Sequence, residues 1–243
     1  MKENIYTIPV IEAFENGGEC ALCQMHESLT TNAIDFMLGE AYMDDLIRME
    51  TNKTGFCKTH LTMLYDRQNR LGLSLIMQSH MSDVFFDMRE MLESSGSEKP
   101  VFFKKAHETS AQKIVKYVRR LEHTCYLCNR INDFFNRYVD TIFYLWNKEN
   151  DIKDIIKKSN GFCLNHYATL LETGEKKLST SQFHEFVGLT TPLMLKSLSV
   201  LEEDLDWFVK KYDYRFAKEP WKNSRDSLQR ALKKMQSINV KEE

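Results

Sequence analysis

CALC at residues 20–23 is followed, after a spacer, by GFCKTH at residues 55–60, and this pattern decides the fold. It returns as CYLC at residues 125–128 followed by GFCLNH at residues 161–166, with a spacer of almost the same length. The two copies contain all six cysteines of the chain. Self-similarity of this kind indicates an internal duplication, so we expect two related repeats.

Each copy of the pattern supplies three cysteines and one histidine, a donor set typical of a closed tetrahedral metal site. A CxxC turn offers two thiolates, and a CxxH motif on the first turn of a helix offers a thiolate and an imidazole on one face. The pattern therefore predicts two Cys3His sites that hold two zinc ions per chain, with zinc favoured over iron. The predicted ligands are Cys20, Cys23, Cys57, His60, Cys125, Cys128, Cys163 and His166.

Other roles for the cysteines fit less well. A thioredoxin-like redox motif needs a strand before its helix, and no strand pattern is present. Haem attachment needs a histidine directly after the second cysteine, where Gln24 and Asn129 stand. An iron–sulfur cluster with one histidine ligand stays open. His26 and His123 are not expected to be ligands, because the other copy has no histidine at either position.

The ligands can pair in two ways. Each site can form within its own repeat, or the motif at residues 20–23 can meet the one at residues 161–166 across a pseudo-two-fold axis. The within-repeat pairing is favoured here because it closes the shorter loop, at a lower entropic cost.

Apolar residues recur at helical spacing nearly throughout, which predicts an all-α fold of roughly ten or eleven helices in two pseudo-symmetric repeats, each held by a metal site. Helices should begin at both CxxC and both CxxH motifs, with Gly55 and Gly161 as left-handed or turn residues just before them. A final helix is predicted over residues 224–237, with Asn223 or Ser224 as its N-cap.

The sequence divides into repeat 1 at residues 1–97, repeat 2 at residues 98–210, and a basic C-terminal extension with a helix at residues 211–243. Residues 94–100, SSGSEKP, are typical of a linker.

Net charge and hydropathy indicate which partners and which compartment to expect. The chain has 243 residues and a net charge of −2, so no global field favours nucleic acid or anionic membranes. The N-terminus lacks the apolar stretch of a signal peptide, and no apolar run is as long as a membrane span. We therefore expect a cytoplasmic protein, whose closely spaced cysteines are more often metal ligands than disulfides.

A Gln-x-His sequence also occurs in both copies, as Gln78 with His80 and Gln182 with His184. Both histidines lie near apolar helix positions, so we expect them to face the interior. There they would be hydrogen-bonded imidazoles or would line a pocket between the repeats. No acid, base or nucleophile constellation surrounds them, and no catalytic residue is predicted.

Several further segments resemble a known family. Together with the two cysteine patterns, residues 69–75 (NRLGLSL), DYR at 213–215 and PW at 220–221 resemble the DUF6062 family, a group of bacterial proteins without an assigned activity. The resemblance covers most of the chain and implies no reaction, ligand or metal.

Three functions are compatible with these features. The first is a metal-stabilised binding or scaffold protein, not expected to be an enzyme, with an unknown protein or small-molecule partner. The second is a thiol- or metal-dependent enzyme or redox sensor that uses the cysteine clusters. The third is a nucleic-acid-binding regulator that uses the basic C-terminal helix; its charges are dispersed and partly offset by acids, so nucleic acid is the less favoured partner.

Overall fold

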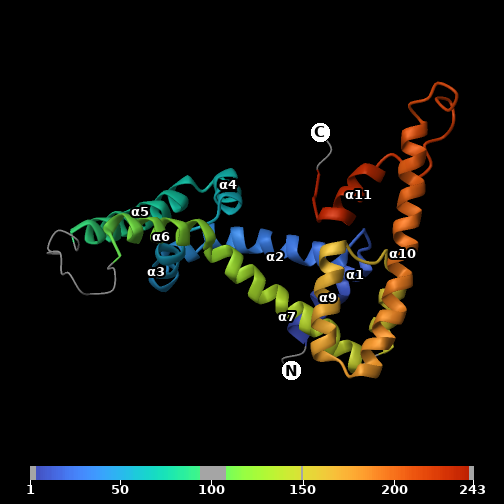
Figure 1. The fold of residues 1–243 in the computed structure, drawn as a ribbon, viewed down its shortest axis with the longest axis horizontal. Helices are drawn as coiled ribbons and strands as arrows, with labels where there is room; N and C mark the ends of the chain where they lie inside the picture. Colours follow the sequence, from blue (N-terminus) through green and yellow to red (C-terminus); the bar gives the residue numbers. More distant parts are fainter. Residues whose placement is uncertain (1–3, 94–107, 149, 241–243) are drawn as a thin grey trace. The chain divides into compact units, whose positions relative to one another are not determined.

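The computed structural model describes residues 4–93, 108–148 and 150–240, and the linker predicted at residues 94–100 lies outside them. The described residues form eleven α-helices and one short 3-10 helix, without a strand, which confirms the all-α fold (Figure 1). The elements are α1 Asn4–Glu15, α2 Ala21–Leu38, η1 Ala41–Met43, α3 Asp45–Thr54, α4 Lys58–Asp66, α5 Arg70–Glu93, α6 Ser110–His123, α7 Tyr126–Lys148, α8 Asn150–Lys158, α9 Leu164–Lys177, α10 Thr180–Lys210 and α11 Ser227–Gln236. None of these helices combines the length and apolar character needed to cross a membrane.

The helix starts follow the motifs, as predicted. Helices α2 and α7 begin one residue after the first cysteine of each CxxC, and α4 and α9 begin one residue after the cysteine of each CxxH. Gly55 and Gly161 have φ angles of 61° and 79°, positive values that favour glycine, as expected for turn residues before each CxxH motif. The prediction for the last helix was wrong at its start. Ser224 donates its hydroxyl to the Trp221 carbonyl in a preceding turn, and α11 begins only at Ser227.

The chain divides into two compact units. The central unit is the continuous segment of residues 29–133, and the split unit combines residues 1–28 with residues 134–243. Each unit contains parts of both sequence copies, and the repeat boundary near residue 97 stays a prediction. The internal duplication therefore stays a prediction from the sequence.

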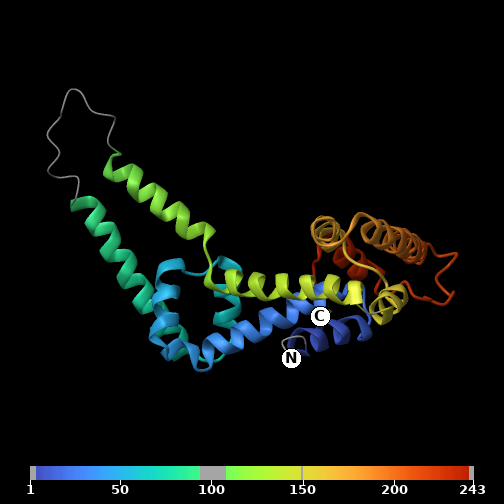
Figure 2. The ribbon, with the colours of Figure 1, turned by 90° about the horizontal axis from the view of Figure 1, so that it is seen from below.

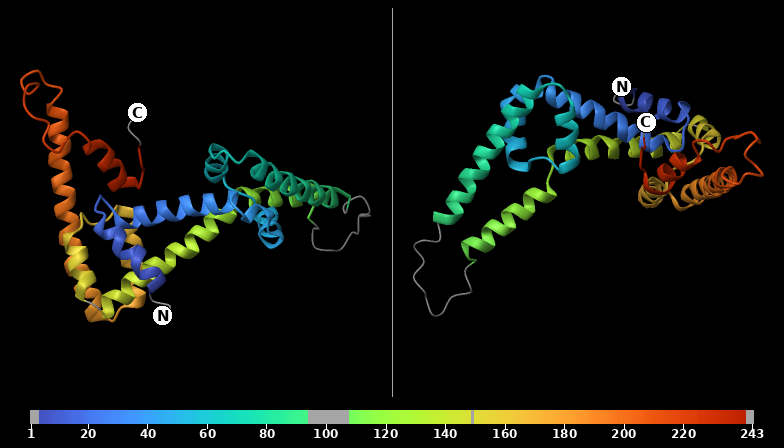
Figure 3. Two further views of the ribbon diagram at one scale, coloured as in Figure 1. Left: turned by 180° about the vertical axis from the view of Figure 1, so that it is seen from behind. Right: turned by 90° about the horizontal axis from the view of Figure 1, so that it is seen from above.

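The split unit has an aromatic core. The Phe186 ring lies 5.3 Å from Phe143 and 5.0 Å from Trp146, and Phe162 stacks on Tyr167 at 6.2 Å between ring centroids. Helix α11 packs against both α9 and α10, as Figure 3 shows. The basic C-terminal segment therefore belongs to this unit.

The central unit has a core of aliphatic side chains from α2, α4, α5 and the start of α7. Its buried members include Ile34, Met37, Leu64, Ile76 and Leu127. Helix α5 packs against α3 on one part of its length and runs beside α6 (Figure 2). This core holds the first turns of α4 and α7 in place, and those turns contain metal-ligand candidates.

Candidate metal centres

The eight predicted ligands form two groups, and each group lies within one unit. Site 1, in the split unit, consists of Cys20, Cys23, Cys163 and His166. Site 2, in the central unit, consists of Cys57, His60, Cys125 and Cys128. Within each group the donor atoms all lie within 4.8 Å of one another, so either group could hold a metal ion.

Both sites combine a CxxC motif from one sequence copy with the CxxH motif of the other. The within-repeat pairing favoured by the loop argument is therefore wrong. The exchanged pairing closes a loop about twice as long at site 2 and about four times as long at site 1, which costs about 2 kcal/mol in total because each doubling costs roughly 0.6 kcal/mol. Hydrogen bonds beside each site outweigh this difference. In site 2 the Tyr126 N–H donates to Gly55 O at 3.0 Å, and the Thr124 hydroxyl donates to Thr54 O at 2.7 Å.

All eight candidate ligands stand at the beginnings of four helices. In each motif the first ligand directly precedes the helix and the second is the third helical residue. Site 1 therefore lies where α2 and α9 begin, and site 2 where α4 and α7 begin. The free N–H groups and the positive end of a helix favour thiolates at this position.

The donor atoms of site 1 have the spacing of a tetrahedral metal shell. The Sγ atoms of Cys23 and Cys163 are 3.6 Å apart, and His166 Nδ1 lies 3.2–3.6 Å from the sulfurs of Cys20, Cys23 and Cys163. Bond lengths around zinc place neighbouring donors about 3.5–3.8 Å apart in a tetrahedron. All four residues are buried.

Contacts within site 1 separate the pKa values of its thiols. The thiols of Cys20 and Cys23 donate to the sulfur of Cys163 and lower its pKa well below the usual range, and hydrogen bonds to Cys163 and Cys20 raise the pKa of Cys23. Burial alone would lower the pKa of His166, but its contacts with Cys163 and Cys20 outweigh burial and raise the pKa to about 9. A metal ion that takes all four donors must therefore displace protons.

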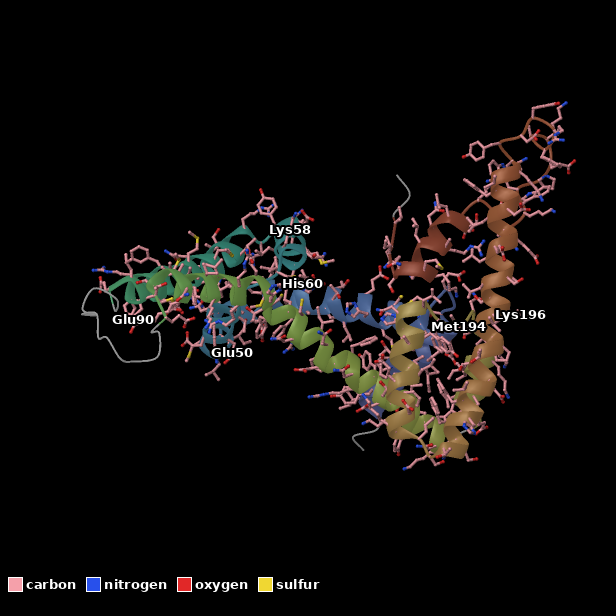
Figure 4. All side chains as sticks on the ribbon, viewed as in Figure 1. Glu50, Lys58, His60, Glu90, Met194 and Lys196 are labelled. Atoms are coloured by element: carbon pink, nitrogen blue, oxygen red, sulfur yellow. The ribbon has the colours of Figure 1, made fainter. Side chains whose placement is uncertain are left out.

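Site 2 has the same arrangement, with His60 on the first turn of α4 (Figure 4). His60 Nδ1 lies 3.3 Å from each of the sulfurs of Cys57, Cys125 and Cys128, and the Cys57 and Cys128 sulfurs are 3.8 Å apart. Site 2 differs from site 1 in exposure, because Cys57 and Cys128 are only half-buried. The sulfurs of site 2 are therefore more accessible to reagents from solvent.

The thiols of site 2 also differ from one another. Burial opposes ionisation of Cys57, but the backbone N–H of His60 and the thiols of Cys128 and Cys125 outweigh it and lower the pKa of Cys57. Burial and the neighbouring Cys125 raise the pKa of Cys128 to about 12. Each site thus has one readily ionised cysteine, and in both sites it directly precedes the helix that carries the histidine.

The Gly-Phe pair before each CxxH motif anchors the site. A side chain on Gly161 would come within 3.0 Å of Met194 Sδ, and the φ of 79° also favours glycine there. The N–H of the buried Phe162 donates to the same sulfur at 3.1 Å (Figure 4 labels Met194 on α10). A Cβ atom on Gly55 would likewise come within 3.0 Å of the His80 imidazole. These contacts hold the backbone that carries the next cysteine.

Two residues support site 1 that were not recognised from the sequence. They are Lys234 in α11 and Ser237 directly after that helix. The Lys234 ammonium is fully buried and donates to Glu19 O at 2.9 Å and Asn160 O at 2.8 Å. It also pairs with the Glu19 carboxylate at 2.9 Å. The Ser237 hydroxyl lies 3.1 Å from the Cys163 sulfur. The sequence showed only a basic C-terminal helix, whereas the fold shows that Lys234 joins the segments that precede both motifs of site 1.

The repeated Gln-x-His residues are not equivalent. His80 is half-buried, with its Nδ1 2.7 Å from Asn52 O in the central unit, so the expected hydrogen-bonded imidazole is present there. His184 is exposed in the split unit, so the expectation that it faces the interior is wrong. Gln182 forms the capping box of α10 with Ser179, and Gln78 is exposed. The pocket proposed between the two histidines stays a prediction.

The two histidines excluded as ligands lie outside both groups in the described part of the chain. His26 packs at 5.5 Å against Phe135, whose ring lies 5.2 Å from His166. Burial lowers the pKa of His26, which favours its neutral form. His123 is the last residue of α6 and is exposed.

Comparisons with known proteins identify a family but no function. No curated protein and no solved structure matches the chain. One family model, described as a family of unknown function, DUF6062, matches residues 1–242. This match covers both sites and confirms the resemblance noted from the cysteine patterns. The chain, with its two Cys3His groups in an all-helical fold, therefore belongs to the DUF6062 family.

Proposed function

We propose that this protein is a zinc-stabilised helical binding or scaffold protein, with two zinc ions per chain and an unknown ligand. The main support for this proposal is that each group supplies three cysteine sulfurs and one histidine nitrogen at tetrahedral spacing. A zinc ion with four protein ligands keeps no position for water or substrate, and such sites are structural. Each ion would add on the order of 10–16 kcal/mol of apparent binding free energy to folding.

The distances support a single ion at each site. Cys23 and Cys163 in site 1, and Cys57 and Cys128 in site 2, have sulfurs 3.6 Å and 3.8 Å apart. An iron–sulfur cluster distributes its four protein ligands over two or four iron atoms, and ligands on different iron atoms lie further apart than ligands that share a single ion. Thiolate and imidazole donors in a tetrahedron suit zinc above other single ions. A reducing compartment such as the cytoplasm would keep these thiols available as ligands.

A redox sensor at site 2 is the second candidate, because Cys57 and Cys128 are half-buried and adjacent. Nucleic-acid binding by α11 has less support. Arg230 pairs with Asp204 at 2.8 Å and with Asp226 at 3.0 Å, and Lys234 is buried, so these two cations serve the fold.

The metal content of single-histidine variants tests the proposal. Full-length protein, purified without added metal, should contain close to two zinc ions per chain by elemental analysis. His166→Ala and His60→Ala should each lose about one ion, because each removes one of four ligands. His26→Ala and His123→Ala are the matched controls and should retain both. A folded, metal-free and chelator-resistant protein would overturn the proposal, as would equal losses in the controls.

A further inference from the structure

A cavity of about 260 Å³ lies in the split unit, between the end of α8, one face of α10 and α11. The α10 wall repeats at helical spacing through Leu193, Lys196, Ser197, Val200 and Leu201. Residues 157–160 form the α8 wall, and the remaining lining residues are Glu19 and Arg230. Figure 4 labels Lys196 on α10.

Most charges around this cavity are already balanced. The Glu19 carboxylate, the one acidic group in the lining, pairs with the buried Lys234 at 2.9 Å and lies 3.8 Å from Arg230. Arg230 is held in turn by Asp204 and Asp226. Among the lining lysines, Lys157 pairs with Asp154 at 3.0 Å.

Two cations remain without a carboxylate partner in the described part of the chain. Lys158 stands at the end of α8 and Lys196 on the facing side of α10, and both are exposed. The neighbouring Ser197 hydroxyl and Asn160 amide add hydrogen-bonding groups. Two lysines in the lining of one cavity favour an anion with two negative charges, because each ammonium group can form a charge-assisted hydrogen bond.

The cavity also has an apolar side. Leu193, Val200 and Leu201 line it from α10. Its volume lies just below the usual range for small-molecule sites, which begins at about 300 Å³. The occupant should therefore be small, with an anionic head and a short apolar body.

We propose that this cavity binds a small phosphate monoester, with its phosphate between Lys158 and Lys196 and its apolar part against α10. A phosphate monoester carries nearly two negative charges at neutral pH, whereas a carboxylate carries one. The inference names a ligand class for the binding role proposed above. It rests on that proposed function because the cavity adjoins site 1. Glu19 and Asn160 hold the cavity beside the two motifs of site 1.

Calorimetric titration of the zinc-loaded, full-length protein with phenyl phosphate tests the inference. Benzoate and inorganic phosphate are the comparison ligands. Phenyl phosphate should bind more tightly than either, because benzoate lacks the second charge and inorganic phosphate lacks the apolar body. Equal or tighter binding of benzoate would overturn the phosphate assignment, and equal binding of inorganic phosphate would overturn the role of the apolar wall.

Paired variants locate the site. Lys158→Gln with Lys196→Gln should weaken phenyl phosphate binding at least about tenfold, since each lysine contributes a hydrogen bond to a charged group. The matched control is Lys176→Gln with Lys218→Gln, two exposed lysines of the same unit outside the cavity lining. The control should change the affinity less than about twofold, because it removes equal charge elsewhere.

The outcomes separate this inference from the proposed zinc role. Protein that holds two zinc ions but does not bind phenyl phosphate would overturn the inference and leave the zinc role standing. Equal weakening in the pocket and control variants would show non-specific attraction and would also overturn it. Protein without zinc would contradict the proposed function independently of any titration.

Discussion

Replacing Lys234 by Met should destabilise the split unit and loosen site 1. The side chain has no exposed surface, and its ammonium contacts the carbonyl oxygens of Glu19 and Asn160 and the Glu19 carboxylate. Methionine has a similar length but cannot donate a hydrogen bond. The variant therefore keeps the packing and leaves two carbonyl oxygens and a buried carboxylate without this partner.

The cost follows from these contacts. Removing one partner of a buried ion pair costs about 3–5 kcal/mol of stability. Leaving a buried hydrogen-bond acceptor without a donor costs about 1–3 kcal/mol. The contributions overlap because they share one ammonium group, and Arg230 at 3.8 Å still offsets part of the Glu19 charge. We expect the free energy of unfolding to fall by about 3–5 kcal/mol in total.

Urea unfolding of the zinc-loaded protein measures this loss, and zinc transfer to a coloured chelator measures the effect on the sites. One zinc ion should leave faster in Lys234→Met, while the ion in site 2 should be unaffected because that site lies in the central unit. Lys233→Met is the matched control, since Lys233 forms no ion pair within the described residues. A free energy within about 1 kcal/mol of wild type, below the usual cost of a broken buried pair, would refute the reasoning.

Three further predictions concern the metal sites. Ser237→Ala removes the hydroxyl beside the Cys163 sulfur, so the sulfur-to-metal absorption band of the cobalt-substituted protein should shift and one ion should exchange faster; an unchanged spectrum would contradict the contact. Limited alkylation followed by mass spectrometry should modify Cys57 before Cys163, because the pKa of both thiols is lowered and only Cys57 is half-buried; the reverse order would contradict the exposure difference. Zinc affinity should fall as the pH falls, because the metal displaces protons from Cys128 (pKa about 12) and from His166 (pKa about 9), and both groups are protonated below those values in the metal-free protein; competition with a chelator at several pH values measures the slope, and a pH-independent affinity would count against this ligand set.

Local patterns made part of the structure predictable. The CxxC and CxxH spacings place one ligand just before a helix and the next on its first turn, and this geometry depends on neighbouring residues alone. Glycine at positions 55 and 161 likewise follows from a positive φ that other residues adopt at a cost. Comparison of the two copies also sets His26 apart from the candidate ligands, because Ile131 stands at the matching position.

Contacts between distant segments made the rest unpredictable. The start of α11 was misplaced because Ser224 is used in a preceding turn, and His184 was misjudged because nearby apolar residues do not show which side of α10 is covered. Lys234 is one of several basic residues of the C-terminal segment, and nothing in the neighbouring sequence sets it apart. Its burial depends on Glu19 and Asn160, which are far away in the chain.

The sequence by itself determined the helical class, the eight candidate ligands and the helix ends on which they stand, because each depends on residues a few positions apart. Only the tertiary structure decided which motifs meet. The two pairings differ by about 2 kcal/mol in loop entropy, which is less than a few tertiary hydrogen bonds and a buried ion pair contribute. The Tyr126 N–H on Gly55 O in site 2 and Lys234 between Glu19 and Asn160 at site 1 exist only in the exchanged arrangement. Those contacts between distant segments select it.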